Sequence, residues 1–133
     1  MKSYVFDSYA MIAFFEAEAG ADRVAEILND IAAKKARGFM SVINWGEILY
    51  NTMREAGAAE AEKVMHQFES YAIQLVDANK ELTYAAAKLK ADYRIAYADC
   101  FAGALSAEID APLVTGDPDF KKLAHEIAVE WIT

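Results

Sequence analysis

The sequence predicts an α/β fold of three layers, with helices on both faces of a mainly parallel central sheet. Short apolar segments typical of strands alternate along the chain with longer segments in which apolar residues recur every three or four positions, as in amphipathic helices. This alternation favours parallel strands joined by helical crossovers. The chain has 133 residues, of which 56% are hydrophobic, enough for one buried core. We therefore expect a single domain over residues 1–133.

The chain opens with a strand, residues 4–6, followed by two helices. Ser8 is a candidate N-cap for the first helix, which we expect to end at Gly20. A second helix is expected from residue 22 to about residue 37, because its apolar residues are spaced by three and four. Gly38 then breaks the helical pattern.

The middle of the chain returns to a strand at residues 39–41 and then becomes helical again. Helical periodicity covers residues 42–56 and 58–71, with Gly57 between them. These two helices are expected to form a hairpin that projects from the sheet. Alternation of apolar and polar residues predicts a third strand over residues 73–76.

The last part of the chain contains three predicted helices and two predicted strands. Asn79 is the expected N-cap of a helix that reaches Tyr93. The remaining predicted elements are a helix over residues 101–109, a strand over 112–115, a short helix from 118 to 125, and a strand over 127–132.

Composition limits the kinds of function that the chain performs. The formal net charge is -8, from 13 basic and 21 acidic residues, which excludes a protein that coats nucleic acid through a basic surface but leaves a nuclease open. The single cysteine, Cys100, excludes an intramolecular disulfide and a thiolate zinc site. No apolar run approaches the ~18–20 residues of a membrane span, and the first residues leave no room for a signal peptide. We expect a cytoplasmic protein.

Four acidic residues lie where predicted strands end or helices begin: Asp7, Glu47, Asp99 and Asp117. Ligands of an open parallel sheet bind outside the carboxyl ends of its strands. Carboxylates gathered at that edge repel one another unless a cation lies among them, and such an oxygen-rich pocket suits Mg²⁺ or Mn²⁺. The four acids therefore indicate a metal-dependent enzyme that acts on phosphate esters.

Each acid also has a simpler structural interpretation. Asp7 is a possible cap of the first helix, and Asp117 or Asp119 of the last short helix. Asp99 would favour the positive end of its own helix, and Glu47 would be a solvated helix residue. Only folding can bring these distant residues together, so the sequence leaves both interpretations open.

Four segments carry a resemblance to a known family. Residues 5–10, Val-Phe-Asp-Ser-Tyr-Ala, resemble the opening of PIN domains, especially VapC-type toxins. The segments 41–47, 97–102 and 113–120 resemble the second, third and fourth acidic motifs of that family, in matching order.

The resemblance implies a PIN fold and an endoribonuclease that depends on Mg²⁺ or Mn²⁺ and attacks RNA, with tRNA or rRNA as candidate targets, through a metal-activated water. It also implies a homodimer and a cognate antitoxin whose tail occupies the active groove. Carried over by motif, the metal-binding and catalytic residues are Asp7, Glu47, Asp99 and Asp117. Weaker supporting positions are Ser8, Thr115 and Asp119.

Two other functions remain open from the sequence. One is a phosphoacceptor signalling module, in which Asp77 after the third strand would accept the phosphoryl group. The other is a PIN-like scaffold that binds RNA or protein without catalysis. Labelling by a small phosphodonor would support the first, and failure to bind any divalent cation would support the second.

Overall fold

The computed structural model describes all residues, 1–133, and its centre is a sheet of five parallel strands in the order β3-β2-β1-β4-β5. The strands are β1 (Lys2–Phe6), β2 (Ala36–Ser41), β3 (Ile73–Val76), β4 (Leu113–Thr115) and β5 (Val129–Trp131). The helices are α1 (Ser8–Phe15), α2 (Ala21–Ala32), α3 (Val42–Ala56), α4 (Ala58–Glu69), α5 (Lys80–Asp92), α6 (Tyr97–Ile109) and the 3₁₀ helix η1 (Pro118–Leu123). The predicted α/β class with a parallel sheet is confirmed.

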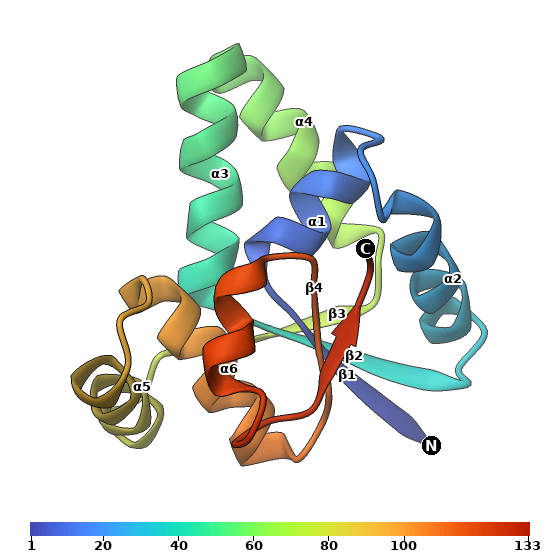
Figure 1. Cartoon of the computed structure of the whole chain (residues 1–133). Helices are drawn as coiled ribbons and strands as arrows, with labels where there is room; N and C mark the ends of the chain where they lie inside the picture. Colours follow the sequence, from blue (N-terminus) through green and yellow to red (C-terminus); the bar gives the residue numbers. More distant parts are fainter.

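Helices cover both faces of the sheet (Figure 1). Successive residues of β1 face opposite layers, as the pleat of a strand requires. Tyr4 and Phe6 pack into a buried cluster with apolar residues of α1, α2 and α4, whereas Val5 packs into a second cluster with α5 and α6. The core is thus two apolar layers separated by the sheet.

The strand order reverses at the centre of the sheet. From β1 the chain moves outward through β2 to β3, then returns to the other side of β1 to form β4 and β5. Phe6 of β1 pairs with Val114 of β4, so the residues that follow these two strands emerge side by side. Such a reversal is the usual place for a ligand in an open parallel sheet.

The N-cap of the first helix lies one residue before the predicted cap, and the helix ends earlier than predicted. Asp7, not Ser8, is its N-cap, because the Asp7 carboxylate accepts the amide hydrogen of Ala10. The helix ends at Phe15 rather than Gly20. Ala17 has a φ of 54°, a left-handed conformation that stops the helix, and Glu18 N–H bonds back to the carbonyl of Ala13.

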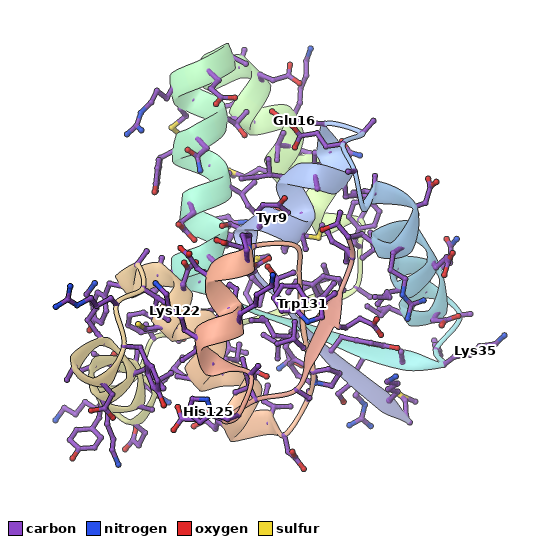
Figure 2. All side chains as sticks on the ribbon, viewed as in Figure 1. Tyr9, Glu16, Lys35, Lys122, His125 and Trp131 are labelled. Atoms are coloured by element: carbon purple, nitrogen blue, oxygen red, sulfur yellow. The ribbon has the colours of Figure 1, made fainter.

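The second helix is also shorter than predicted. It ends at Ala32, where Lys34 adopts a φ of 61° and its N–H bonds to the carbonyl of Ile31. Lys35, in the turn that follows, points away from the body of the protein (Figure 2). Gly38 does not break a helix but lies inside β2, where a Cβ would stand 2.7 Å from Cδ1 of Ile31. The glycine therefore allows α2 to pack closely on the sheet.

The predicted hairpin and the predicted cap are confirmed. Helices α3 and α4 project together beyond the edge of the sheet (Figure 1), joined at Gly57, whose φ is 90°. Asn79 caps α5 by accepting the amide hydrogen of Leu82 at 2.9 Å. Helix η1 and strand β5 are shorter than the predicted ranges. None of the helices combines the length and the apolar character needed to cross a membrane.

Candidate active site

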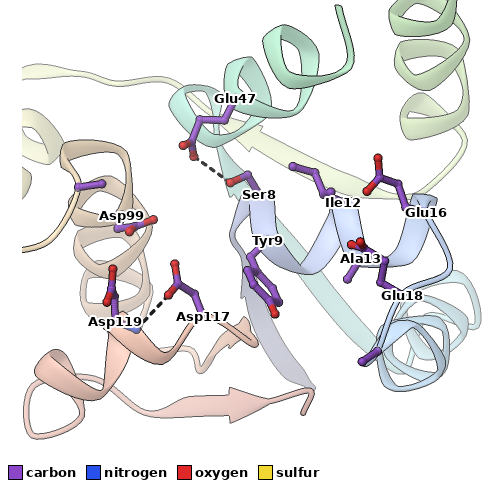
Figure 3. Close-up of a pocket in the computed structure, with 12 residues that line it drawn as sticks. Ser8, Tyr9, Ile12, Ala13, Glu16, Glu18, Glu47, Asp99, Asp117 and Asp119 are labelled. Carbon is purple, nitrogen blue, oxygen red and sulfur yellow. Dashed lines mark hydrogen bonds between the residues drawn. The ribbon is translucent and has the colours of Figure 1, made fainter. Parts of the chain in front are cut away.

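A cavity of about 750 Å³ opens at the carboxyl edge of the sheet, bounded by α1, α3, the start of α6 and the segment after β4 (Figure 3). Its titratable lining residues apart from Tyr9 are all carboxylic acids, and no lysine, arginine or histidine lines it. The six acids are Glu16, Glu18, Glu47, Asp99, Asp117 and Asp119. Their negative charge has no compensating cation within the lining.

Asp7 is 1% exposed and does not line this cavity, although the next residue, Ser8, does. Its Oδ1 accepts the amide hydrogen of Ala10 at 2.8 Å, and its Oδ2 accepts the hydroxyl hydrogen of Thr115 at 2.5 Å. Burial and, to a smaller extent, the nearby charges of Asp99 and Asp117 raise the pKa of Asp7 to about 8, although the two hydrogen bonds partly oppose that rise. The carboxyl group is therefore held rigidly in a site that penalises its charge.

Thr115 connects Asp7 to the next acid along the cavity wall. Its buried hydroxyl oxygen accepts the amide hydrogen of Asp117 at 3.0 Å while it donates to Asp7. Between them, Gly116 has no unusual φ, but a Cβ there would come within 2.6 Å of the Tyr9 ring. The glycine is thus required for the close approach of α1 to the end of β4, rather than for a turn.

Three of the lining acids form the tightest group. One carboxylate oxygen from each of Asp99, Asp117 and Asp119 lies within 4.8 Å of the other two. Burial, together with the charges of Asp117, Glu47 and Asp119, raises the pKa of Asp99 to about 7. Asp117 also caps η1, since its Oδ1 accepts the amide hydrogen of Asp119 at 2.9 Å (Figure 3). The Oδ2 atom of Asp117 has no hydrogen-bond partner in the protein. Neither carboxylate oxygen of Asp119 has one.

Glu47 approaches from the opposite wall, on the second turn of α3. Its Oε1 accepts a hydrogen bond from the Ser8 hydroxyl at 2.9 Å (Figure 3) and another from the Asn44 amide at 3.1 Å. The same Asn44 nitrogen donates to the carbonyl of Ala98 on α6 at 3.1 Å. Both donors engage Oε1, so no protein donor occupies Oε2.

The structure thus places the predicted residues in three positions. Asp99, Asp117 and Asp119 form the close group, Glu47 faces them across the same cavity, and Asp7 is buried outside the lining, joined to Asp117 through Thr115. Ser8 and Thr115 both hydrogen-bond predicted acids. Asp77, the residue of the phosphoacceptor alternative, is exposed after the edge strand β3 and does not line the cavity.

Three residues of the site were not singled out from the sequence. Glu16 and Glu18 were missed because they were expected inside a longer first helix. Asn44 was missed because its role depends on contacts with other segments. A signal for Asn44 was nevertheless present, since it is a polar residue among the apolar Ile43, Trp45 and Ile48, one turn before Glu47.

The comparison with known families decides the identity. A family model described as "PIN domain" matches residues 4–126, nearly the whole chain. The chain belongs to the PIN-domain family. The resemblance found in the four sequence motifs is confirmed, although none of the curated protein sequences matches the chain.

Solved structures similar to this chain include toxin–antitoxin complexes and a toxin. VapBC2 from Rickettsia felis, bound to a fragment of its promoter DNA, has 18% identity and a TM-score of 0.74 over 96% of this chain and 97% of that one. DNA-bound VapBC from Salmonella typhimurium has 13% identity and a TM-score of 0.77 over 100% of both chains. VapC20 from Mycobacterium tuberculosis, a toxin that cleaves the sarcin–ricin loop, has 14% identity and a TM-score of 0.69 over 96% and 97%.

The acids of this PIN domain fit a divalent cation by their chemistry and by their electrostatics. Hard carboxylate oxygens are the ligands that Mg²⁺ and Mn²⁺ prefer. The mutual repulsion that raises the pKa of Asp99, and contributes to that of Asp7, falls when positive charge lies between them. The geometry of Asp99, Asp117 and Asp119 allows one ion to contact an oxygen of each.

Proposed function

We propose that this protein is a VapC-type toxin, a metal-dependent endoribonuclease of a toxin–antitoxin pair, and that residues 1–133 act as one domain in the cytoplasm. The observation that carries the proposal is the convergence of carboxylates from four separate segments at the reversal of the strand order. Such a cluster costs stability unless it binds a cation, and a cation is what an acidic protein needs to receive a phosphodiester.

Mg²⁺ or Mn²⁺ is the proposed cofactor, held by Asp7, Glu47, Asp99 and Asp117, with Asp119 contributing from the rim of the cavity. The cation supplies positive charge that neutralises the carboxylates, acidifies a water molecule and stabilises the charge that develops on phosphate oxygens. Which of the two ions serves in the cell depends on their availability more than on these ligands.

The side chains of the chain hold the reacting groups in place. The paired hydrogen bonds to Asp7 and the two donors on Glu47 Oε1 fix these carboxylates before any substrate arrives. Water attacks the phosphorus in line and the 3′ oxygen leaves, so the products carry a 5′-phosphate and a 3′-hydroxyl. No serine or cysteine nucleophile is required.

A cognate antitoxin is the proposed protein partner. An apolar groove continues from the cavity between α1, α3 and α4, and it shares Ile12 and Glu16 with the cavity. Its floor includes Phe15, Ile48 and Val64, and its rim carries the acids Glu16, Glu55 and Glu60. An amphipathic segment with basic residues fits such a groove. The inferred homodimer would use exposed apolar residues, among them Tyr50, Met53 and Tyr84.

The test is cleavage of RNA by the purified protein with Mg²⁺, with Mn²⁺ and with a chelator, followed by sequencing of the new 5′ ends. We expect discrete cuts with 5′-phosphate ends only when a divalent ion is present. Asp99→Asn should lower the cleavage rate at least about 100-fold, because it removes charge from the centre of the acidic group. Cleavage that persists in the chelator would contradict the proposal.

A negative result has a defined meaning. If no RNA is cut but calorimetry shows that the protein binds Mn²⁺, the RNA-cleaving activity is excluded and the cation site stands. If neither cleavage nor binding is seen, the non-catalytic scaffold is the better interpretation. DNA substrates in the same assay separate a ribonuclease from a general nuclease.

A further inference from the structure

Asn44 joins the two helices that carry Glu47 and Asp99. The residue is 0% exposed and belongs to the first turn of α3. Its amide nitrogen donates to Glu47 Oε1 in its own helix and to the carbonyl oxygen of Ala98, the residue before Asp99 in α6, both at 3.1 Å. One side chain therefore fixes the rotamer of one acid and the backbone next to another.

The orientation of the amide group follows from its neighbours. Both groups that face the Asn44 nitrogen are oxygens that can only accept, a carboxylate and a carbonyl, so the opposite orientation would place three oxygens together. The cost of the observed orientation is that Asn44 Oδ1 is buried without a hydrogen-bond partner, the only buried side-chain atom of this kind in the structure. An apolar side chain of similar size would fill the same space without this cost, so packing alone does not explain an asparagine here.

We propose that Asn44 is a positioning residue of the acidic site, which holds Glu47 Oε1 so that Oε2 faces the cavity, and holds the start of α6 at the distance that Glu47 and Asp99 need to share a cation. The inference rests on the proposed cation site. Asn44 touches neither the ion nor the substrate and acts through Glu47 and the Ala98 carbonyl.

Asn44→Leu separates this role from a role in folding. Leucine has nearly the same size, and both acceptors keep another donor: Ser8 still bonds Glu47 Oε1, and helix geometry supplies the amide of Ala102 to the Ala98 carbonyl. The substitution also removes the unpartnered Oδ1. We therefore expect the thermal midpoint of the metal-free protein to stay the same or rise, while the cation site loses its alignment.

The experiment measures the dissociation constant for Mn²⁺ by calorimetry on metal-free protein. Asn44→Leu should bind Mn²⁺ about 10- to 100-fold more weakly than wild type, as expected when a group that orients a metal ligand is removed. The matched control is Asn79→Leu, which removes the cap of α5. It should lower the thermal midpoint and leave Mn²⁺ affinity unchanged, the reverse of the Asn44 variant.

A double-variant comparison tests whether Asn44 acts through Glu47. In a Glu47→Gln background most of the effect of Asn44→Leu on Mn²⁺ affinity should disappear, because the carboxylate that Asn44 orients is gone.

Three results would count against the inference. Mn²⁺ affinity of Asn44→Leu within about twofold of wild type would overturn it alone. An equal loss in wild-type and Glu47→Gln backgrounds would show that Asn44 does not act through Glu47, and would overturn it too. A wild-type protein that binds no Mn²⁺ would overturn the proposed cation site and this inference together.

Discussion

Asp7 shows at the scale of a single residue that the site contains a buried carboxyl group whose ionisation is unfavourable. Its carboxyl group caps α1, accepts the Thr115 hydroxyl and is almost completely buried. Of the two interpretations that the sequence left open for Asp7, capping is observed, because its Oδ1 accepts the amide hydrogen of Ala10, and metal binding stays a proposal. The raised pKa shows that the two hydrogen bonds do not offset the loss of hydration. A bound cation would supply the missing stabilisation.

The pH dependence of stability follows from Asp7. Its pKa of about 8 in the folded protein lies above the value of about 4 in an unfolded chain, so its contribution to stability is complete below about pH 4 and is lost as the pH rises through 8. In a chelator, the melting temperature should fall between pH 5 and pH 8.5. Asp7→Asn, which keeps the shape without the charge, should weaken this dependence and stabilise the metal-free protein at pH 8 by a few kcal/mol, on the order expected for such a shift. If the melting temperatures of the wild type and of Asp7→Asn change with pH by the same amount, this prediction is wrong.

Two of the helices that carry residues of the site, α1 and α3, are placed directly after strands. Helix α1 starts one residue after β1, and α3 starts immediately after β2, with Ser41 as its cap. Helix α3 and helix α6, which follows α5, each contain a glycine in the interior, and the surroundings of the two glycines differ. A Cβ on Gly46 of α3 would meet nothing within 4 Å, whereas a Cβ on Gly103 of α6 would lie 2.9 Å from Leu123. The first glycine only weakens its helix, and the second allows α6 to approach η1.

The paired substitutions test this difference between the two helices. Gly46→Ala should stabilise the protein by about 0.5–1 kcal/mol, because alanine has the higher helix propensity and meets no neighbour. Gly103→Ala should destabilise it by about 1–3 kcal/mol, since the added methyl group forces Leu123 from its position. Urea denaturation of the two variants and the wild type measures both. A gain in stability for Gly103→Ala would show that α6 and η1 have room to separate.

The whole molecule concentrates acids at one edge of its sheet. The chain has a net charge of -8, and six of its carboxylic acids line one cavity that contains no basic residue. The segments that supply them are far apart in sequence, and the parallel topology brings their ends to the same edge. The acids repel one another across this edge in the metal-free state.

Divalent ions should therefore stabilise the whole fold. At a concentration 100 times the dissociation constant, the gain is about 2.7 kcal/mol. The rise in melting temperature should be larger at pH 8 than at pH 5.5, because protons compete with the ion for Asp7 and Asp99 at the lower pH. Sodium chloride at equal ionic strength is the control for screening, and Asp117→Asn should reduce the gain. The same rise with sodium chloride as with Mg²⁺ would argue against specific binding.

The sequence by itself determined the α/β alternation, the cap at Asn79, the projecting hairpin and the four acidic motifs, because period, capping and turn preferences depend on neighbouring residues. Only the tertiary structure decided where α1 and α2 end. Ala17 and Lys34 adopt the left-handed conformation after these helices, but alanine and lysine are not residue types that usually mark a helix end. It also decided that Asp7 is buried while Asp119 is exposed.

The hydrogen bonds within the site could not be predicted from the sequence. The hydrogen bonds from Ser8 to Glu47, from Asn44 to Ala98 and from Thr115 to Asp7 join residues 39, 54 and 108 positions apart. Burial, spacing and hydrogen-bond partners at such distances arise when the strands align, and no local pattern encodes them.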